Sequence, residues 1–266
     1  MENDTSSAYW NERFRLHGES RGTYKAICSY GMPYLYNKYI DIIQKKAFTT
    51  PLNALNLKNK SVLDIGCGTG RWCRILADRG AQVTGIDISE KAIALAQRKT
   101  RGDDVCFMVS SIANLELPPH SFDFITCVTV LQHVTAPEEF ERSLSTIKSL
   151  LKPDGKLIIM EVAPTTTDNR HSTQVLRVRT EKDYLEQLSG VGLDLEKVLS
   201  TDVVSLVQKR IIPFSGKIQR RLLRILVNAA VVLTFPIDFI FAGTRYLRTK
   251  SWHKVFVYCN TFERKE

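Results

Sequence analysis

A glycine-rich turn, GCGTG at residues 66–70, follows a short apolar run and precedes a helical pattern. Glycines at such a turn let backbone N–H groups approach a ligand closely. Asp64 stands two residues before the turn, and Asp87 closes the next apolar run. Because a carboxylate at the end of that run can accept hydrogen bonds from a ribose diol, the spacing predicts a ligand that contains a nucleoside.

The spacing of the glycines separates the candidate ligands. A tight turn without a ligand would use the same residues, and a dinucleotide site would also use Asp87. The dinucleotide fingerprint is GxGxxG, whereas Gly66, Gly68 and Gly70 form GxGxG. S-adenosylmethionine carries a sulfonium and an ammonium but no phosphate, so Asp64 beside the turn favours this ligand. The turn without a ligand and the dinucleotide site stay open as alternatives.

Short apolar runs alternate with helical patterns through most of the chain. Five strands are predicted, at residues 61–65, 82–86, 105–109, 122–128 and 156–162. The helices between them are predicted at residues 71–79, 89–98 and 138–151. Such alternation at short spacing favours a parallel sheet with helices on both faces. Further elements are predicted as a helical N-terminal segment over residues 8–50, a helix at 181–188 and strands at 194–199 and 255–259.

Four motifs follow one another between residues 60 and 163. They are VLDIGCGTGRW (Val62–Trp72), GIDIS (Gly85–Ser89), SFDFITCVTVLQHV (Ser121–Val134) and LLKPDGKLIIME (Leu150–Glu161). In this order they resemble the motifs of class I S-adenosylmethionine-dependent methyltransferases, in the branch that acts on small-molecule or lipid-linked acceptors. The resemblance implies an α/β fold with a doubly wound, seven-stranded, mostly parallel, Rossmann-like sheet. It also implies S-adenosylmethionine as the cofactor.

The resemblance implies roles for single residues. Gly66, Cys67 and Gly68 would line the methionine part of the cofactor, with Val128 beside it. The other expected cofactor contacts are Trp10 as a cover, Asp64 as the acid beside the turn, Asp87 at the ribose hydroxyls and Ile88 on the adenine.

One position departs from the family pattern. After the third strand the family usually places an acid that binds the adenine amino group, whereas this chain has Ser111 followed by Ile112. The serine hydroxyl can still accept one hydrogen bond, although a weaker one. We therefore expect the same cofactor at this position, held less tightly.

A methyl acceptor with a hydroxyl group has to lose a proton, and His133 is the first candidate base. It follows the fourth strand, so we expect it at the pocket rim, and an ordinary histidine pKa of about 6.5 suits this task. The alternative is a histidine that only caps or bonds the next helix. Glu161, at the end of the fifth strand, is the second candidate, and His171 with Arg170 on a loop is the third.

Length and composition restrict the class of protein to which this chain can belong. The 266 residues suffice for one α/β domain with an elaboration. The six cysteines form no CxxC pair, and the first residues do not have a signal-peptide pattern, which favours a reducing, cytoplasmic setting without a structural metal.

Nucleic-acid methyltransferases typically carry Asn or Asp followed by Pro-Pro and an aromatic residue, and residues 127–131 lack this motif. Nucleic acid is therefore not expected as a partner.

The net charge of +9 is concentrated between residues 209 and 254, where there are ten basic residues and one acid. The same segment contains the most apolar run, Ile225–Phe241, which is short and polar for a membrane span. We expect a helical hairpin bent at Pro236 that lies on a membrane surface. Because the sixth strand should run parallel to the first five, this hairpin should start beside the pocket. A buried helix pair or a dimer interface is the alternative.

These observations predict three parts of the chain: an N-terminal helical lid at residues 1–50, a methyltransferase domain at 51–207 and 254–266, and a basic, apolar helical insertion at 208–253. The expected activity is transfer of a methyl group from S-adenosylmethionine to a small-molecule or lipid-linked acceptor at a membrane surface. The rival interpretation is a membrane-associated protein that binds S-adenosylmethionine without turnover.

Overall fold

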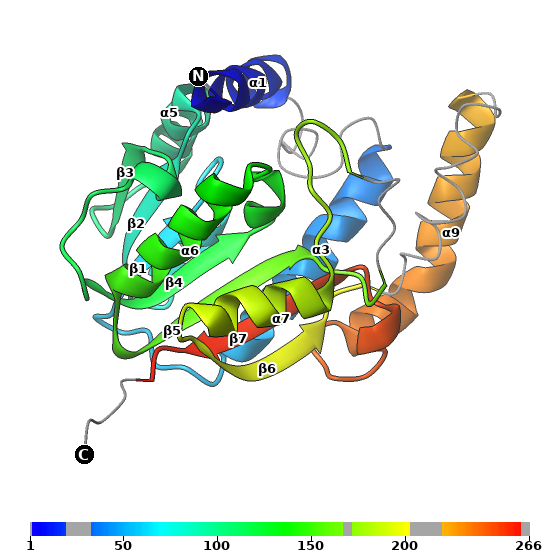
Figure 1. The fold of residues 1–266 in the computed structure, drawn as a ribbon. Helices are drawn as coiled ribbons and strands as arrows, with labels where there is room; N and C mark the ends of the chain where they lie inside the picture. Colours follow the sequence, from blue (N-terminus) through cyan, green and yellow to red (C-terminus); the bar gives the residue numbers. More distant parts are fainter. Residues whose placement is uncertain (1, 20–32, 167–171, 203–219, 262–266) are drawn as a thin grey trace.

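The computed structural model describes residues 2–19, 33–166, 172–202 and 220–261. At its centre is a seven-stranded sheet with the strand order β3-β2-β1-β4-β5-β7-β6 (Figure 1). The strands are β1 (Ser61–Ile65), β2 (Gln82–Asp87), β3 (Val105–Val109), β4 (Phe122–Val128), β5 (Leu151–Val162), β6 (Asp194–Ser200) and β7 (His253–Cys259).

The strand directions confirm the predicted, mostly parallel sheet. β1 pairs in parallel with β2 and β4, and β3 and β5 continue the parallel order on either side. β7 runs antiparallel to both of its neighbours, β5 and β6. β6 is therefore parallel to the first five strands, as expected. The beginning of β7 consequently lies at the same edge of the sheet as the carboxyl end of β5.

Helices cover both faces of the sheet (Figure 1). The α-helices are α1 (Glu2–His17), α3 (Tyr34–Leu52), α4 (Arg71–Ala77), α5 (Glu90–Lys99), α6 (Pro137–Leu150), α7 (Glu181–Gly190) and α9 (Arg220–Phe241). Short 3-10 helices are η1 (Ile112–Asn114), η2 (Leu131–His133) and η5 (Arg248–Lys250). Local capping starts two of the helices: Ser89 accepts a hydrogen bond from the N–H of Ala92, and Thr180 forms a capping box with Asp183.

Among the strands, the fifth is the one whose predicted start differs most from the structure. It begins at Leu151 rather than at residue 156, because its pairing with β4 continues across an irregularity between Phe122 and Phe124. An extra stretch of chain in one strand is accommodated as a bulge, which a hydrophobic pattern alone does not reveal.

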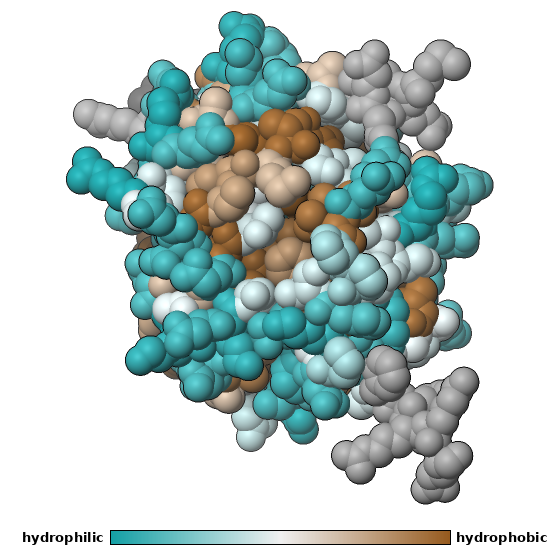
Figure 2. Space-filling model, turned by 90° about the vertical axis from the view of Figure 1, so that its left-hand side faces the viewer, coloured by the Kyte–Doolittle hydropathy of each residue, from teal (hydrophilic) through white to brown (hydrophobic). Residues whose placement is uncertain are grey.

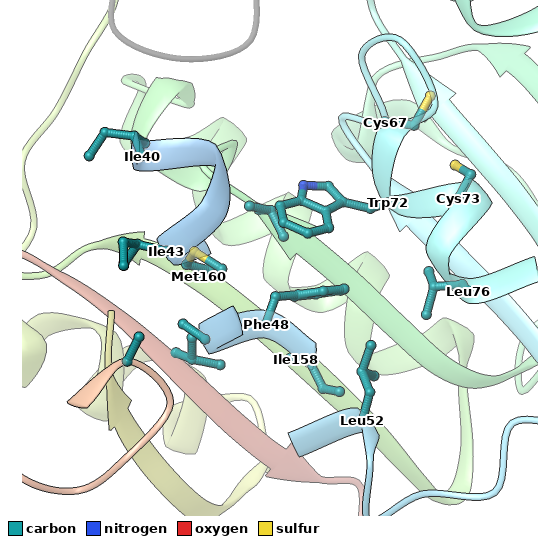
Figure 3. Packing of buried hydrophobic residues seen from close by; sticks show 14 of the residues in the cluster. Ile40, Ile43, Phe48, Leu52, Cys67, Trp72, Cys73, Leu76, Ile158 and Met160 are labelled. Atoms are coloured by element: carbon teal, nitrogen blue, oxygen red, sulfur yellow. The ribbon is translucent and has the colours of Figure 1, made fainter. Parts of the chain in front are cut away.

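One face of the sheet is covered by α3 and α4, whose side chains form a single core with β5 (Figure 3). Ile43 and Phe48 of α3 belong to the same cluster as Ile158 and Met160 of β5. The ring centroid of Phe48 lies 4.5 Å from that of Trp72 in α4. Because α4 starts directly after the glycine turn, this packing fixes the position of the turn.

The opposite face is covered by α6 and α7 (Figure 1). Phe140 and Leu144 of α6 and Tyr184 of α7 are buried in one cluster with Ile125 of β4 and Ile159 of β5. Apolar packing on both faces explains why β4 and β5 read as nearly continuous apolar runs.

α9 is one continuous helix, so the predicted hairpin bent at Pro236 is wrong. Proline removes one backbone hydrogen bond, but contacts on both sides of Pro236 hold the helix against α3. The ring centroid of Phe235 lies 6.0 Å from that of Tyr39, and the Tyr39 hydroxyl donates a hydrogen bond to the buried carboxylate of Asp238. α9 stands beside α3 and extends beyond the sheet (Figure 1). None of the helices in the described ranges is long and apolar enough to cross a membrane.

β3 forms one edge of the sheet, and its side chains are unusually apolar for an edge. Met108 and Val109 are exposed to solvent. Figure 2, which views this side of the molecule, shows apolar side chains gathered at its centre within a hydrophilic border. An apolar edge strand of this kind is a surface through which strands of two molecules can pair.

Candidate cofactor and acceptor site

A cavity of about 360 Å³ opens at the carboxyl ends of the parallel strands, where sheets of this type place their ligands. Its wall is formed by α1 and by the loops that follow β1, β2, β3 and β4. Ten of the predicted site residues line it together: Trp10, Gly66, Cys67, Gly68, Asp87, Ile88, Ser111, Ile112, Val128 and His133.

The glycine turn has the backbone conformation that its sequence predicts. Gly66, Gly68 and Gly70 all have positive φ angles, of 64°, 55° and 71°. A side chain at Gly66 would also clash, because its Cβ would lie 2.2 Å from Cγ2 of Val130. Both the backbone conformation and the packing therefore require glycine at this position.

Asp87 receives two backbone hydrogen bonds at the end of β2. Its Oδ2 accepts from the N–H of Gly68 at 2.9 Å, and its Oδ1 accepts from the N–H of Ser89, also at 2.9 Å. Burial raises the pKa of Asp87 to about 6, although both N–H groups act to lower it. Each carboxylate oxygen keeps a further lone pair, so the pair of oxygens can accept from a diol while holding the turn.

Asp64 needs a correction, because it lies beneath the glycine turn and does not line the cavity. Its Oδ1 accepts a hydrogen bond from the Thr126 hydroxyl at 2.8 Å, and its Oδ2 lies 3.1 Å from the Cys73 sulfur. Burial raises the pKa of this carboxyl to about 6. Asp64 therefore connects β1 to β4 and α4, and it can act on a ligand only through the loop above it.

α1 is attached to the loop after β2, which places Trp10 at the cavity. The Ser7 hydroxyl donates a hydrogen bond to the carbonyl oxygen of Ile88, and the Ser89 hydroxyl donates to Asn11. These contacts bring Trp10 into the cavity wall, as the sequence predicts for a covering residue.

Ser111 and Ile112 form the part of the wall after β3. The Ser111 hydroxyl oxygen accepts a hydrogen bond from the N–H of Ala113 and caps η1. Ile112 is buried but reaches the cavity. The serine hydroxyl proton remains available to a ligand, so the family's acid is replaced here by a group that can also donate.

Glu161 does not line the cavity, which argues against its predicted role as a second candidate base. Its carboxylate accepts the backbone N–H groups of Val130, Leu131 and Gln132 at 2.9, 2.8 and 3.2 Å. Burial raises the pKa of Glu161 to about 7, although the three N–H groups act to lower it. Glu161 therefore holds the loop after β4, and this loop carries the wall residues on that side of the cavity.

His133 lies in the cavity wall with a fixed ring orientation. Its Nδ1 lies 2.6 Å from the carbonyl oxygen of Val175, so Nδ1 carries the proton and donates it. The Gln132 side chain accepts from the N–H of Val162 with its oxygen, and its nitrogen lies 3.1 Å from Nε2 of His133. The Trp10 ring centroid is 4.9 Å from the imidazole. Because Nε2 already accepts from Gln132, this ring can take another proton only after that contact breaks.

The pH dependence of stability should reveal the burial of His133. Burial lowers the pKa of His133 from 6.5 to about 4, so the unfolded chain binds a proton between these values and the folded chain does not. This contribution is fully present above pH 6.5 and is lost as the pH falls towards 4. We expect a loss on the order of 3 kcal/mol, measured by urea unfolding against a His133→Gln variant. Identical pH dependence of the two proteins would contradict this account.

One side of the cavity was not predicted. Val162, Leu176, Trp252 and His253 line it beyond the predicted site residues. Val162 ends β5, Trp252 directly precedes β7 and His253 begins β7, so the signal that could have indicated them is the antiparallel direction of the last strand. His171 and Arg170 lie outside the described residues.

Comparison with known proteins relates part of this chain to a family. Residues 63–159 match the family model described as a methyltransferase domain. The ubiquinone biosynthesis O-methyltransferase of Coxiella burnetii is 36% identical over 140 residues, which are 52% of this chain and 56% of that protein. The protein of the same name from Chromobacterium violaceum is 41% identical over 105 residues, covering 38% of this chain and 43% of that protein. The chain spans about half the length of these curated relatives.

Solved structures share the fold over nearly the whole chain. The magnesium protoporphyrin IX methyltransferase of Synechocystis, solved with bound S-adenosylmethionine, has a TM-score of 0.59 and 20% identity, and the match covers 96% of this chain and 97% of that one. The 1,6-didemethyltoxoflavin-N1-methyltransferase of Burkholderia thailandensis has a TM-score of 0.57 and 18% identity, with coverage of 98% and 91%. At these identities the likeness establishes the fold.

Proposed function

We propose that this chain, whose residues 63–159 match a methyltransferase domain model, transfers the methyl group of S-adenosylmethionine to a small-molecule acceptor. The observation that carries the proposal is one continuous cavity. At one end it is lined by the glycine turn, Asp87 and Trp10, and at the other by an apolar wall that includes Trp252. Such a cavity can hold a nucleoside-type donor and an apolar acceptor next to each other.

The lining fits S-adenosylmethionine. The exposed backbone at Gly66 admits close approach, the Asp87 oxygens match the two ribose hydroxyls, and Ile88 and Ile112 offer apolar surfaces for the adenine. When bound, the cofactor supplies an activated methyl group. The contribution of the protein is then to align the acceptor with that group and to exclude water.

The acceptor end of the cavity favours a ring with a hydroxyl group. Val162, Leu176 and Trp252 belong to one apolar cluster, so they provide a surface for a planar or lipid-linked molecule. The curated relatives are named for O-methylation in ubiquinone biosynthesis, which is consistent with an aromatic hydroxyl as acceptor. We therefore propose an aromatic, quinone-precursor-like or lipid-linked acceptor.

Calorimetry followed by a turnover assay tests this function. S-adenosylmethionine should bind, and incubation with a lipid extract should release S-adenosylhomocysteine and yield a methylated product that mass spectrometry identifies. Binding without turnover would favour the rival interpretation, a membrane-associated binding protein. Failure to bind the cofactor would contradict both.

We also propose that α9 attaches the protein to a membrane surface. One side of the helix packs inward through Val227 and Val231, whereas Leu233, Val232 and Ile240 are 76%, 64% and 62% exposed. Exposed apolar surface of this extent is typical of a contact site for lipid or protein. Within the described residues, Lys254 is buried, and both Lys254 and Arg248 pair with Glu181. Other basic residues of the segment between residues 209 and 254 would contact anionic head groups.

The proposed domain organisation keeps the three predicted parts. In the first part, residues 1–50, the helices α1 and α3 have different roles. α1 contributes to the cavity wall, and α3 packs in the main core and against α9 while adding Ile40 and Gln44 to the wall. In the described part of residues 1–50, α1 would therefore act as the lid over the cofactor, and α3 would support the cavity from the core.

Sedimentation with liposomes tests the membrane contact. The native protein should sediment with anionic liposomes and be partly released by high salt, because the contact combines apolar and electrostatic contributions. Val232→Glu with Leu233→Glu should release it by placing two negative charges at the centre of the exposed face. Leu195→Glu, an exposed residue on β6, is the matched control and should not change sedimentation. A concentration-dependent dimer without liposome binding would indicate a protein interface instead.

A further inference from the structure

An aspartate and a histidine meet where the chain leaves the sheet for α9 and where it returns. Asp202 follows the end of β6, and His253 is the first residue of β7. The two ends are held together by backbone contacts, since the N–H of Thr201 donates to the carbonyl oxygen of His253. Backbone contacts therefore hold the pair at the edge of the sheet, with His253 in β7 and Asp202 just after β6.

Asp202 contacts His253 with both carboxylate oxygens. Oδ1 accepts the backbone N–H of His253 at 3.2 Å, and Oδ2 lies 3.0 Å from Nδ1 of its imidazole. Because a carboxylate only accepts, Nδ1 carries the proton, which leaves a lone pair on Nε2. Within the part of the chain that the structure describes, Nε2 has no hydrogen-bond partner.

The surroundings keep Asp202 ionised. Burial alone would raise its pKa, but the His253 imidazole and the backbone N–H groups hold the pKa of Asp202 below its ordinary value. Its side chain is 2% exposed, and that of His253 is 12% exposed. The other charged groups nearby are Lys254, which pairs with Glu181 from α7, and Arg248 from η5, which also contacts Glu181. An ionised, buried Asp202 stabilises the imidazole when it becomes positively charged.

The position of His253 is suited to the acceptor. His253 pairs with Val162 in the register of β5 and β7, at the edge of the sheet that carries the cofactor residues. Its side chain lines the same cavity as Gly66 and Asp87, next to the apolar wall of Val162 and Trp252. An acceptor that packs on this wall would present its hydroxyl group near His253.

His133 and His253 differ in the contacts of their Nε2 atoms. Nε2 of His133 already accepts from Gln132, and its ring faces Trp10. Within the described residues, Nε2 of His253 has no such contact. Nδ1 of His253 contacts the Asp202 carboxylate, whereas Nδ1 of His133 contacts the carbonyl oxygen of Val175. Of the two histidines that line the cavity in the described part of the chain, His253 has the arrangement that base catalysis requires.

We propose that His253 is the general base that takes the proton from an aromatic hydroxyl acceptor, and that Asp202 is its positioning residue. The proposal rests on the function proposed above. In the step, the acceptor O–H bond breaks and its proton moves to Nε2 of His253, while an oxygen electron pair forms the new bond to the methyl carbon. The methyl–sulfur bond breaks, and its electron pair stays on sulfur, which changes from sulfonium to thioether. Asp202 balances the charge on the imidazolium until the proton leaves to solvent.

The test uses 4-nitrocatechol, because its absorbance reports ionisation of the hydroxyl group. The full-length protein is saturated with S-adenosylhomocysteine, and the ionisation of the bound probe is followed against pH. Four variants are compared with native protein: His253→Gln, Asp202→Asn, His133→Gln as the variant of the rival base, and His120→Gln, a histidine that does not line the cavity, as the matched control. We expect the bound probe to ionise at lower pH than the free probe in native protein and in His120→Gln. In His253→Gln and Asp202→Asn that shift should disappear.

Turnover of the same probe with S-adenosylmethionine gives the second readout. His253→Gln should lower kcat by about a hundredfold or more, with the dissociation constant of the probe within a factor of about two. Asp202→Asn should lower kcat less and leave KM unchanged, which a merely structural role would not do. His120→Gln should retain turnover.

The outcomes separate this proposal from the proposed function. Calorimetry with S-adenosylhomocysteine shows whether each variant is folded and holds the cofactor. If cofactor binds normally but the native protein neither binds nor ionises 4-nitrocatechol, the assignment of His253 to an aromatic hydroxyl is wrong, while the cofactor assignment stands. Loss of turnover in His133→Gln with full turnover in His253→Gln would overturn the proposal in favour of His133.

Discussion

Replacing Gly66 with valine should abolish measurable binding of S-adenosylmethionine and S-adenosylhomocysteine. Gly66 has a φ of 64°, and a Cβ there would lie 2.2 Å from the Val130 side chain. The branched side chain would both strain the turn and narrow the cavity at the position proposed for the methionine part of the cofactor. We expect isothermal calorimetry to give a dissociation constant at least about a hundredfold weaker, which corresponds to about 2.7 kcal/mol or more.

Gly102→Val is the matched control for this prediction. Gly102 also has a positive φ, of 93°, but a Cβ there would have no atom within 4 Å. The control therefore carries backbone strain without obstructing the cavity, and it should bind the cofactor as the native protein does. Equal loss in both variants, with melting of the fold, would mean that general destabilisation explains the result.

Glu161→Ala should destabilise the protein by about 3–5 kcal/mol in urea unfolding, because it leaves three backbone N–H groups, two of them buried, without their acceptor. Water that enters the space of the side chain would recover part of the loss. Glu161→Gln retains one acceptor oxygen of similar size and should cost less.

The same variants distinguish a role of Glu161 in holding the loop after β4 from a role in catalysis. If Glu161 acts only through the loop after β4, the remaining folded fraction of Glu161→Gln should turn over with an unchanged pH profile. A normal stability combined with a large loss of kcat would instead identify Glu161 as a residue that handles a proton.

The cofactor end of the site could be predicted because its signals are local. The glycine turn and the acid at the end of β2 lie within about 25 residues of each other, and each role follows from a strand end or a turn conformation. Asp64 shows the limit of such reasoning. Its place beside the turn in sequence suggested a ligand contact, but strand alternation directs its side chain beneath the loop, towards Thr126.

The acceptor end could not be predicted because it depends on long-range pairing. His253 reaches Asp202 across the whole insertion, and it reaches Val162 only through the antiparallel register of β7 on β5. In the sequence, His253 is a single histidine before an apolar run. The course of α9 was mispredicted for a related reason: Pro236 suggested a bend, whereas the buried Tyr39–Asp238 contact with α3 favours a continuous helix.

The most direct test of the central claim is a calorimetric titration of the native protein with S-adenosylmethionine and, in parallel, with NAD. Both ligands carry a ribose diol that Asp87 could hold, but only the dinucleotide needs the GxGxxG spacing for its pyrophosphate. The account predicts one-to-one binding of S-adenosylmethionine, competition by S-adenosylhomocysteine, and no heat from NAD. Binding of NAD without binding of S-adenosylmethionine would contradict it.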